Sequence, residues 1–366
     1  TWTDLTTYAK SLALKRGRKH VLGRVEAGEG VIVVDNASGN FWRGNTAGAW
    51  YPNVKPLTLV RVGHNYNDIT RYLFWGVIES VEPDWEVPGE AGFGPKATLG
   101  LIDMFKAFAR FDILDANPAL TADSNVGQKV VDVASATRLY IGQSIRVYDD
   151  GSSEINEIAN ITLGVGIIRL TMVNNLANSY TVGNNGAVKK FPAVLSGTRI
   201  NDVLRELRWP AALSDVDAGQ VLVNAFSPPE AGTNSLEHMQ SIRDVEDGLL
   251  FMRAADGFCV FQDGIARAVQ PLSVSQLTFN DDDSDSKYVH PALMDDETFT
   301  YNEARISGPS IPNITIRDTV AAAAQGPRAW TMDSALYALE SDALMRAWIH
   351  VQRFVTSILR VESLLC

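Results

Sequence analysis

The chain has 366 residues, 46% of them hydrophobic and 20% charged, and a formal net charge of -11. This balance excludes a disordered chain, and the acidic surplus argues against a protein that grips nucleic-acid phosphates. At about 100–200 residues per domain, the length predicts two to four domains. No apolar run reaches the length of a membrane-spanning helix and no signal peptide opens the chain, so we expect a soluble protein made in a reducing cytoplasm.

Residues 1–117 are predicted to form a β-rich domain. A β-branched apolar run at 31–34 leads into a cluster of turn-forming residues at 35–40. The segment 71–79 is apolar at successive positions, which predicts a strand covered on both faces, by its own core and by a neighbour or partner chain. Apolar residues at helical spacing follow at 104–109.

Residues 118–190 change character, because they are rich in Val, Ile, Thr, Asn and Gly and lack Trp and Phe. Short strands flank a hairpin turn at 149–152, where Asp-Gly supplies the positive φ that a tight turn requires. The segment predicts an inserted all-β module, a small barrel of the OB type or a sandwich.

Residues 191–270 predict a mixed α/β domain. One helix starts after 196–199 and carries its apolar face to Leu207, and a second begins at 235 with Asn234 or Ser235 as its cap. A hairpin around Asp256 and Gly257 follows the second helix.

Residues 271–366 return to β structure, with one late helix. Strands are predicted at 298–306 and 357–365, and the second either pairs backwards or belongs to a chain that extends past Cys366. The helix is expected to have Glu340, Ser341 or Asp342 as its cap, and one of its sides is lined by Leu344, Trp348, Val351 and Val355.

Polar residues give little sign of chemistry. None of the histidines (His20, His64, His238, His290 and His350) has metal-ligand spacing, so we expect them at the surface or at caps. Cys259 lies in an apolar run and predicts a buried thiol, and Cys366 is too distant to complete a zinc pattern. The acidic run at 281–286 lacks the glycine and glutamate of a calcium loop, so a solvated loop is preferred.

Two further clusters have a functional and a structural interpretation. The basic run at 15–20 is expected to be a solvated segment or a contact to a partner chain rather than a nucleic-acid patch. Glu79, Glu82, Asp84 and Glu86 could serve as glycosidase acids, but an exposed rim is preferred. We therefore predict no catalytic residue, no cofactor and no metal.

Aromatic residues crowd the first domain. Trp42, Trp50, Tyr51, Trp75 and Trp85 lie within a short stretch. Core packing is the first explanation and a subunit interface the second, because Trp and Tyr are favoured at interfaces. These five residues are the candidate interface.

Several stretches, read in order, resemble the tail-tip hub (minor tail) proteins of long-tailed phages, which are related in fold to the baseplate hub of contractile-tailed phages. No single stretch is diagnostic, and their shared order carries the resemblance. The stretches are 33–41, 45–48, 51–56, 60–62, Leu73-Phe74-Trp75-Gly76-Val77-Ile78-Glu79, 98–103, 199–204, 209–210, Glu246-Asp247-Gly248-Leu249-Leu250-Phe251, 257, 260–263, 301–303 and 360–364.

The resemblance implies a mainly β, multidomain protein with α+β parts. Residues 1–117 and 271–366 would form two tail-tube-like β-barrels, 191–270 a mixed α/β domain, and 118–190 a module on the outside of the hub. Three chains would form a pseudo-sixfold ring that links the sixfold tail tube to the threefold tip and surrounds the DNA exit channel. The cysteine set that holds an iron–sulfur cluster in some hubs is missing, so none is expected.

The resemblance also implies partners and a location. The partners would be two further copies in a homotrimer, the distal tail or tail-tube protein, the tape measure protein and receptor-binding or tip-fibre proteins, with genomic DNA passing through the lumen without specific binding. The location would be the tail tip of the virion. A carbohydrate-binding adhesin of the tip and, less favoured, a cell-wall glycosidase are the alternative functions.

Overall fold

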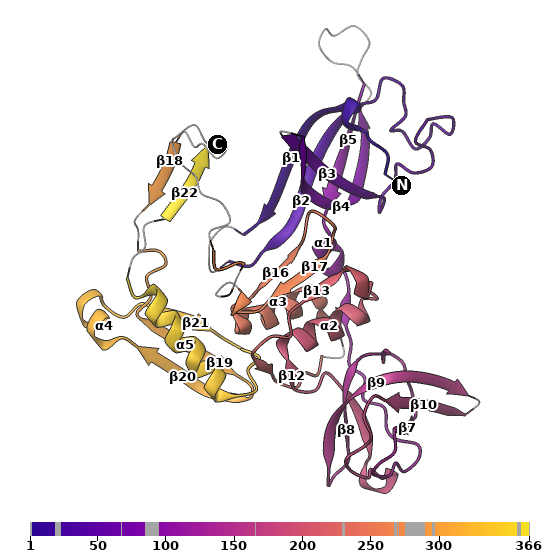
Figure 1. The fold of residues 1–366 in the computed structure, drawn as a ribbon, viewed down its shortest axis with the longest axis vertical. Helices are drawn as coiled ribbons and strands as arrows, with labels where there is room; N and C mark the ends of the chain where they lie inside the picture. Colours follow the sequence, from indigo (N-terminus) through magenta and orange to yellow (C-terminus); the bar gives the residue numbers. More distant parts are fainter. Residues whose placement is uncertain are drawn as a thin grey trace.

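The computed structural model describes residues 2–18, 23–66, 68–84, 95–164, 166–228, 231–266, 269, 271–274, 290–294, 297–356 and 360–365. The chain is mainly β, with several separate sheets and few helices. Figure 1 shows an N-terminal sheet and a small barrel at opposite ends of a central helical unit, with a C-terminal sheet beside that unit. Within this part of the chain, no helix combines the length and apolarity needed to cross a membrane.

The N-terminal unit is an open five-stranded antiparallel sheet that we call the half-barrel. Its order is β1-β2-β5-β4-β3, so β1 and β3 form its edges. Its inner face holds a compact apolar core that includes Val34, Phe74 and Leu101, closed by Phe41 from the loop at 36–58. The strands are β1 (Ala9–Gly17), β2 (Glu26–Asp35), β3 (Leu59–Tyr66), β4 (Ile69–Asp84) and β5 (Lys96–Ile102).

The half-barrel is buried on its second face as well, and the same chain provides the cover. Val77 and Ile102 on that face are 5% and 1% exposed. They lie beside α1 (Met104–Phe108) and the hairpin of β16 (Leu249–Met252) and β17 (Cys259–Gln262) (Figure 1). The prediction of two covered faces therefore holds for this part of β4, with cover from the middle of this chain.

Residues 118–190 contain a small closed barrel. Its five strands have the order β11-β8-β9-β10-β7. The ends of this sheet meet through the segment before β7, because Ala119 pairs with Ala187 and Leu120 pairs with Val133. In the hairpin turn, Asp149 Oδ1 accepts hydrogen bonds from the N–H groups of the two residues at 151–152. The strands are β7 (Val130–Val133), β8 (Ser144–Tyr148), β9 (Ser153–Gly164), β10 (Ile167–Met172) and β11 (Ala187–Lys190).

The central unit joins two helices to short strands. Helix α3 (Ser235–Glu246) begins at Asn234, whose side chain accepts from Glu237 N as the sequence predicts, and ends at Asp247 in the left-handed conformation. Helix α2 (Ser196–Glu206) packs beside it. The short strands are β6 (Asp112–Ile113), β12 (Val194–Leu195), β13 (Ser214–Val216), β14 (Leu222–Val223) and β15 (Thr233–Asn234), of which β13 runs parallel to β17.

The C-terminal region contains a three-stranded sheet, β20-β19-β21, and a separate ribbon of β18 and β22 that stands apart from it in Figure 1. We expected a second barrel between 271 and 366. In the part of this region that the structure describes, neither sheet closes on itself. The elements are β18 (His290–Met294), β19 (Glu303–Gly308), β20 (Ile311–Arg317), α4 (Thr319–Gln325), β21 (Ala329–Met332), α5 (Glu340–Phe354) and β22 (Arg360–Leu365).

Helix α5 divides the apolar side that was predicted, because Val351 faces the core and Leu344 and Trp348 do not. Its buried residues are Ala343, Ala347, His350, Val351 and Phe354, whereas Leu344 and Trp348 are 38% and 55% exposed. Small alanines allow the helix to lie close to β19 and β20, which explains why the bulkier stripe was displaced. The cap prediction was also wrong, since the N-cap is Leu339 without a side-chain hydrogen bond.

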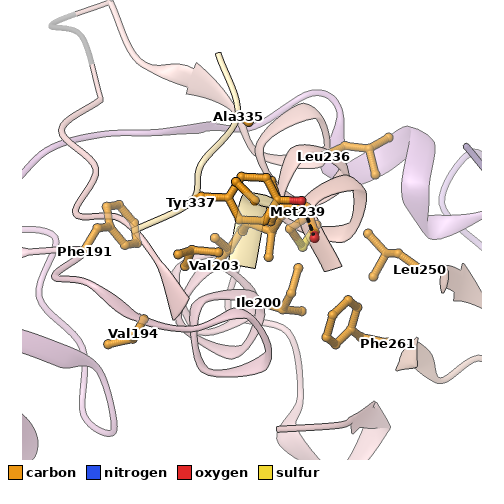
Figure 2. Close-up of a cluster of buried hydrophobic side chains, with 14 of the residues drawn as sticks. Phe191, Val194, Ile200, Val203, Leu236, Met239, Leu250, Phe261, Ala335 and Tyr337 are labelled. Carbon is orange, nitrogen blue, oxygen red and sulfur yellow. Dashed lines mark hydrogen bonds between the residues drawn. The ribbon is translucent and has the colours of Figure 1, made fainter. Parts of the chain in front are cut away.

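One apolar core joins the central unit to the segments before and after it. It includes Phe105 from α1, Ile200 and Met239 from the central helices, and Val351 from α5. Figure 2 shows Tyr337 at its middle, where the hydroxyl donates to Val245 O at 2.9 Å. Cys259 is buried in this core, so the predicted buried thiol is confirmed, and burial raises the pKa of the thiol to about 12. The core thus contains residues from three of the four predicted domains.

Asp103 makes the stability of this region depend on pH. Its carboxylate caps α1 by accepting from Phe105 N at 2.9 Å and also accepts from Gly28 N at 2.5 Å. Burial raises the pKa of Asp103 to about 6, while its backbone hydrogen bonds oppose the rise. Since the folded state holds this proton more tightly than the unfolded state, the stabilisation is complete below pH 4 and is lost as pH rises through 6.

We expect this group to lower the free energy of unfolding by about 2–3 kcal/mol between pH 4 and pH 7. Urea unfolding at both pH values measures the difference. Asp103→Asn should reduce this difference between the two pH values. Part of the difference should remain, because burial also raises the pKa of Asp202 to about 6. An equal pH dependence in wild type and variant would contradict the prediction.

Candidate assembly interface

Three of the five predicted interface residues lie on the loop at 36–58 that closes the half-barrel. Trp50 is partly buried, and its ring meets Tyr8 edge-on at a centroid distance of 6.0 Å. Trp42 and Tyr51 are 46% and 48% exposed. The loop is held by Asn36, whose Oδ1 accepts from Phe41 N at 2.9 Å. This stretch therefore provides one core aromatic and two exposed aromatic residues.

Trp75 lies on the other face of the sheet, because its neighbour Phe74 points into the half-barrel core. Trp75 is half-buried against the turn of the β16–β17 hairpin. A Cβ built on Gly257 would come within 2.3 Å of the indole ring. Trp75 thus joins the half-barrel to the central unit within one chain. Trp85 lies outside the described residues.

Gly257→Ala tests this junction. The residue has φ +76, and its Cβ would press into the Trp75 ring, so we expect a loss of about 2 kcal/mol or more in the free energy of unfolding. Gly127→Ala is the matched control, because Gly127 has φ +85 and nothing within 4 Å of its Cβ position. Equal losses in the two variants, measured by denaturant titration, would show that the Trp75 contact contributes nothing.

Both edges of the half-barrel carry exposed apolar side chains. Leu12 on β1 is 45% exposed and Leu59 on β3 is 51% exposed. Among the residues that the structure describes, neither strand has a second partner. Open edges with apolar residues invite pairing with another chain, and proteins normally protect them. The other exposed apolar residues of this sheet and its turns are Val31, Leu57, Ile69 and Leu73.

Two apolar surfaces were not predicted. One is the outer side of α5, and the other is the end of the β9–β10 hairpin, where Leu163 and Ile167 are 73% and 50% exposed. The helix carries two apolar stripes in its sequence, and spacing alone does not tell which one packs inside. For the hairpin, the sequence does contain an indication of an apolar surface, because residues 158–168 include no charged residue.

The basic run beginning at Lys15 is partly structural, which corrects the solvated interpretation for Arg16. Arg16 donates to Leu73 O at 2.6 Å and to Met252 O at 3.0 Å, and thereby joins β1, β4 and β16. Burial lowers the pKa of this guanidinium. Lys15 pairs with Glu26 at 3.2 Å at the surface.

The candidate glycosidase acids are placed differently from each other. Glu79 is engaged by Lys106 at 3.0 Å and by Arg110 at 2.8 Å, and so fixes α1 to β4. Glu82 is exposed on the same strand. The described residues contain no cluster of three or more metal-ligating side chains, and the acidic run at 281–286 lies outside them.

Two histidines are buried in aromatic stacks, which corrects their predicted surface or capping role. His350 stacks on Trp330 at 3.9 Å and His238 stacks on Phe226 at 4.3 Å. Burial lowers the pKa of His350 to about 3 and that of His238 well below its usual value. Both rings are therefore neutral core groups at physiological pH.

A cavity of about 400 Å³ beside β13 and β17 is lined by several carboxylates. These groups are occupied by the fold: Asp217 accepts from Asp263 N at 3.0 Å, and Asp215 pairs with Arg253 at 2.7 Å. Asp263 in turn accepts from two backbone N–H groups. Each of these three carboxylates is thus hydrogen-bonded or ion-paired within the chain.

The chain matches no family model, and no curated protein matches its sequence. Among solved structures, it is similar to the tail protein from Neisseria meningitidis MC58, with 9% identity, a TM-score of 0.41 and coverage of 91% of this chain and 73% of that one. It is also similar to the 43 kDa tail protein of prophage MuSo2 from Shewanella oneidensis, with 11% identity, a TM-score of 0.40 and coverage of 94% and 78%. For prophage tail protein gp18 from Listeria monocytogenes EGD-e the values are 11%, 0.28, and 66% and 72%. These overlaps are partial and assign no function to this chain.

Proposed function

We propose that this chain is a structural subunit of a phage tail, the hub of the tail tip, and that it acts as a trimeric ring without catalytic activity. The observation that carries the proposal is the half-barrel, whose edge strands β1 and β3 have no second partner in the described residues and carry exposed Leu12 and Leu59. Closing such edges around an axis removes them from solvent. The sequence resemblance to tail-tip hubs, which extends along nearly the whole chain, supports the same function.

In this proposal, the ring joins the sixfold tail tube to the threefold tip and surrounds the DNA exit channel. The distal tail or tail-tube protein, the tape measure protein and tip fibres are its partners. A net charge of -11 suits a lumen through which DNA slides, because like charges weaken adhesion. An image of the tail at a resolution that shows symmetry tests the function directly, since it must place three copies around the axis at the tip.

Leu59→Lys is expected to weaken ring assembly without unfolding the subunit. The substituted ammonium would have to be desolvated in a β3 edge contact, which should cost at least ~10-fold in association. Val126→Lys is the matched control, because Val126 is 61% exposed on the small barrel, away from the sheet edges. Mass photometry and electron microscopy of the assembled particles would read the result. A ring equally stable in both variants would contradict the role of β3.

A carbohydrate-binding adhesin of the tip is the second candidate. It is favoured by the exposed pair Trp42 and Tyr51 on one loop, since aromatic rings offer flat apolar faces to sugars. Binding of host-envelope glycans by the isolated chain, lost in Trp42→Ala and retained in Leu59→Lys, would support this function over a purely structural one.

A further inference from the structure

The outer side of α5 is an apolar surface without charge. Leu344, Met345, Trp348 and Ile349 are 38%, 59%, 55% and 41% exposed, and we call these four residues the α5 row. They occupy positions i, i+1, i+4 and i+5, which are neighbours on a helix surface. The helix packs against β19 and β20 and lies across their sheet in Figure 1. Soluble proteins seldom leave such a row exposed unless a partner covers it.

Asp342, Arg346 and Arg353 border the row on the flank beside Met345 and Ile349. Asp342 and Arg353 are 11 residues apart, which is about three helical turns, so both lie on the same side of α5. Arg346 lies between them but is 11% exposed and is paired with Asp247 at 2.7 Å. The side chain of Arg353 is 43% exposed, and its contact with the same carboxylate is longer, at 3.7 Å. A carboxylate of a partner can replace such a weak surface contact.

We propose that the α5 row binds the α5 row of a second copy of this chain in an antiparallel, twofold pair. In such a pair the charged flank of one helix faces the same flank of the other. With the axis between Ala347 and Trp348, Asp342 of each copy then lies opposite Arg353 of the other, giving two intermolecular ion pairs. Met345 meets the other copy's Ile349, and the two Trp348 rings meet near the axis.

The distribution of charge selects this arrangement over a parallel one. A parallel pair places the charged flank of one helix against the opposite flank of the other. Asp342 of one copy then meets Leu344 of the other and lies near Glu340 at the start of that helix. That contact buries a carboxylate against an apolar side chain and near a like charge. The antiparallel pair instead buries the four apolar side chains and matches both charges.

This contact goes beyond the proposed ring and is independent of it. A ring of three copies uses a threefold axis, whereas the α5 pair uses a twofold axis and joins two subunits or two rings. One helix on each side makes a small interface, so we expect a weak dimer whose population grows with protein concentration. The ring variant Leu59→Lys should leave the pair intact, so failure of one proposal is distinguishable from failure of the other.

Charge exchange gives the decisive experiment. Sedimentation velocity over a range of concentrations should show dimers of the wild-type full chain. Asp342→Lys places like charges opposite Arg353, and Arg353→Glu places like charges opposite Asp342, so each variant alone should dimerise at least ~10-fold more weakly. Mixing the two variants should restore association, because both cross-pairs are then opposite in sign, and the double variant should also recover.

Trp348→Asp supplies the apolar arm of the test. It should abolish dimers, while Val320→Asp on α4, where Val320 is 79% exposed, should not. Circular dichroism confirms that each variant is folded. A wild-type chain that stays monomeric at every concentration overturns the proposal. So does a dimer that Trp348→Asp removes but that the charge variants and their mixture leave unchanged, because the row would then bind in another geometry.

Discussion

Replacing Lys190 by methionine is expected to lower the free energy of unfolding by about 3–5 kcal/mol, because it leaves a buried carboxylate without its cation. The Lys190 ammonium is fully buried, lies 2.7 Å from Glu206 Oε2 and donates to Leu114 O at 2.8 Å. Burial lowers the pKa of Lys190, and Glu206 opposes that change. Because Lys190 ends β11 and Glu206 ends α2, the pair fixes the small barrel to the central unit.

A double variant distinguishes the loss of the Lys190–Glu206 ion pair from the cost of leaving the Glu206 carboxylate buried alone. Lys190→Met combined with Glu206→Leu removes both charges and should recover most of the lost stability, since apolar replacements of buried pairs are often neutral. Lys189→Met is the matched control, because Lys189 is the neighbouring lysine on the same strand and is only half-buried. Denaturant titration measures the free energy of unfolding of the wild type and of these three variants. A loss below ~1 kcal/mol in the single variant, or no recovery in the double variant, would contradict the prediction.

Glu246→Ala is expected to cost a similar amount, about 3–5 kcal/mol, because it leaves one buried and several partly buried donors unpaired. Glu246 Oε2 accepts from Ser196 Oγ at 2.7 Å and from Val221 N at 3.0 Å, and Oε1 accepts from Gln220 N at 3.0 Å. The carboxylate therefore joins the end of α3, the start of α2 and the connection before β14. Gly264 N donates to Oε1 as well, so four donors lose their acceptor together in the variant.

Two variants on the same helix control this measurement. Glu246→Gln keeps the volume and one acceptor oxygen, so it should lose less than the alanine variant. Glu237→Ala changes an exposed glutamate of α3 and should cost ~0.5 kcal/mol or less. If Glu246→Ala proved no more harmful than Glu237→Ala in urea unfolding, the carboxylate would have no structural role.

Local elements were predictable where the sequence contains a local cause. Asn234 caps α3 because its side chain can accept from the N–H three residues on, and the hairpin at 149–152 forms because Asp149 can accept from its own turn. Long-range pairing was not predictable in this way. The placement of β5 between β2 and β4 depends on contacts between strands far apart in sequence, which local pattern does not encode.

The candidate interface was predictable only in part. The crowding of aromatics identified Trp42 and Tyr51, but the same signal included Trp50 and Trp75, which pack inside the chain. Residue type alone cannot separate these cases, because Trp serves both cores and interfaces. The α5 row was not predicted, because the sequence pattern placed Leu344 and Trp348 on one side with Val351, and of these three only Val351 is buried.

The two chain connections of the small barrel lie side by side. The strand that leads out of it runs beside the segment that leads in, since Lys190 N donates to Ala116 O at 3.1 Å. A linker of a few residues could therefore connect Ala116 directly to Lys190 in place of the small barrel. The small barrel could therefore be lost or replaced as one unit in evolution, while the core around Tyr337 keeps its packing.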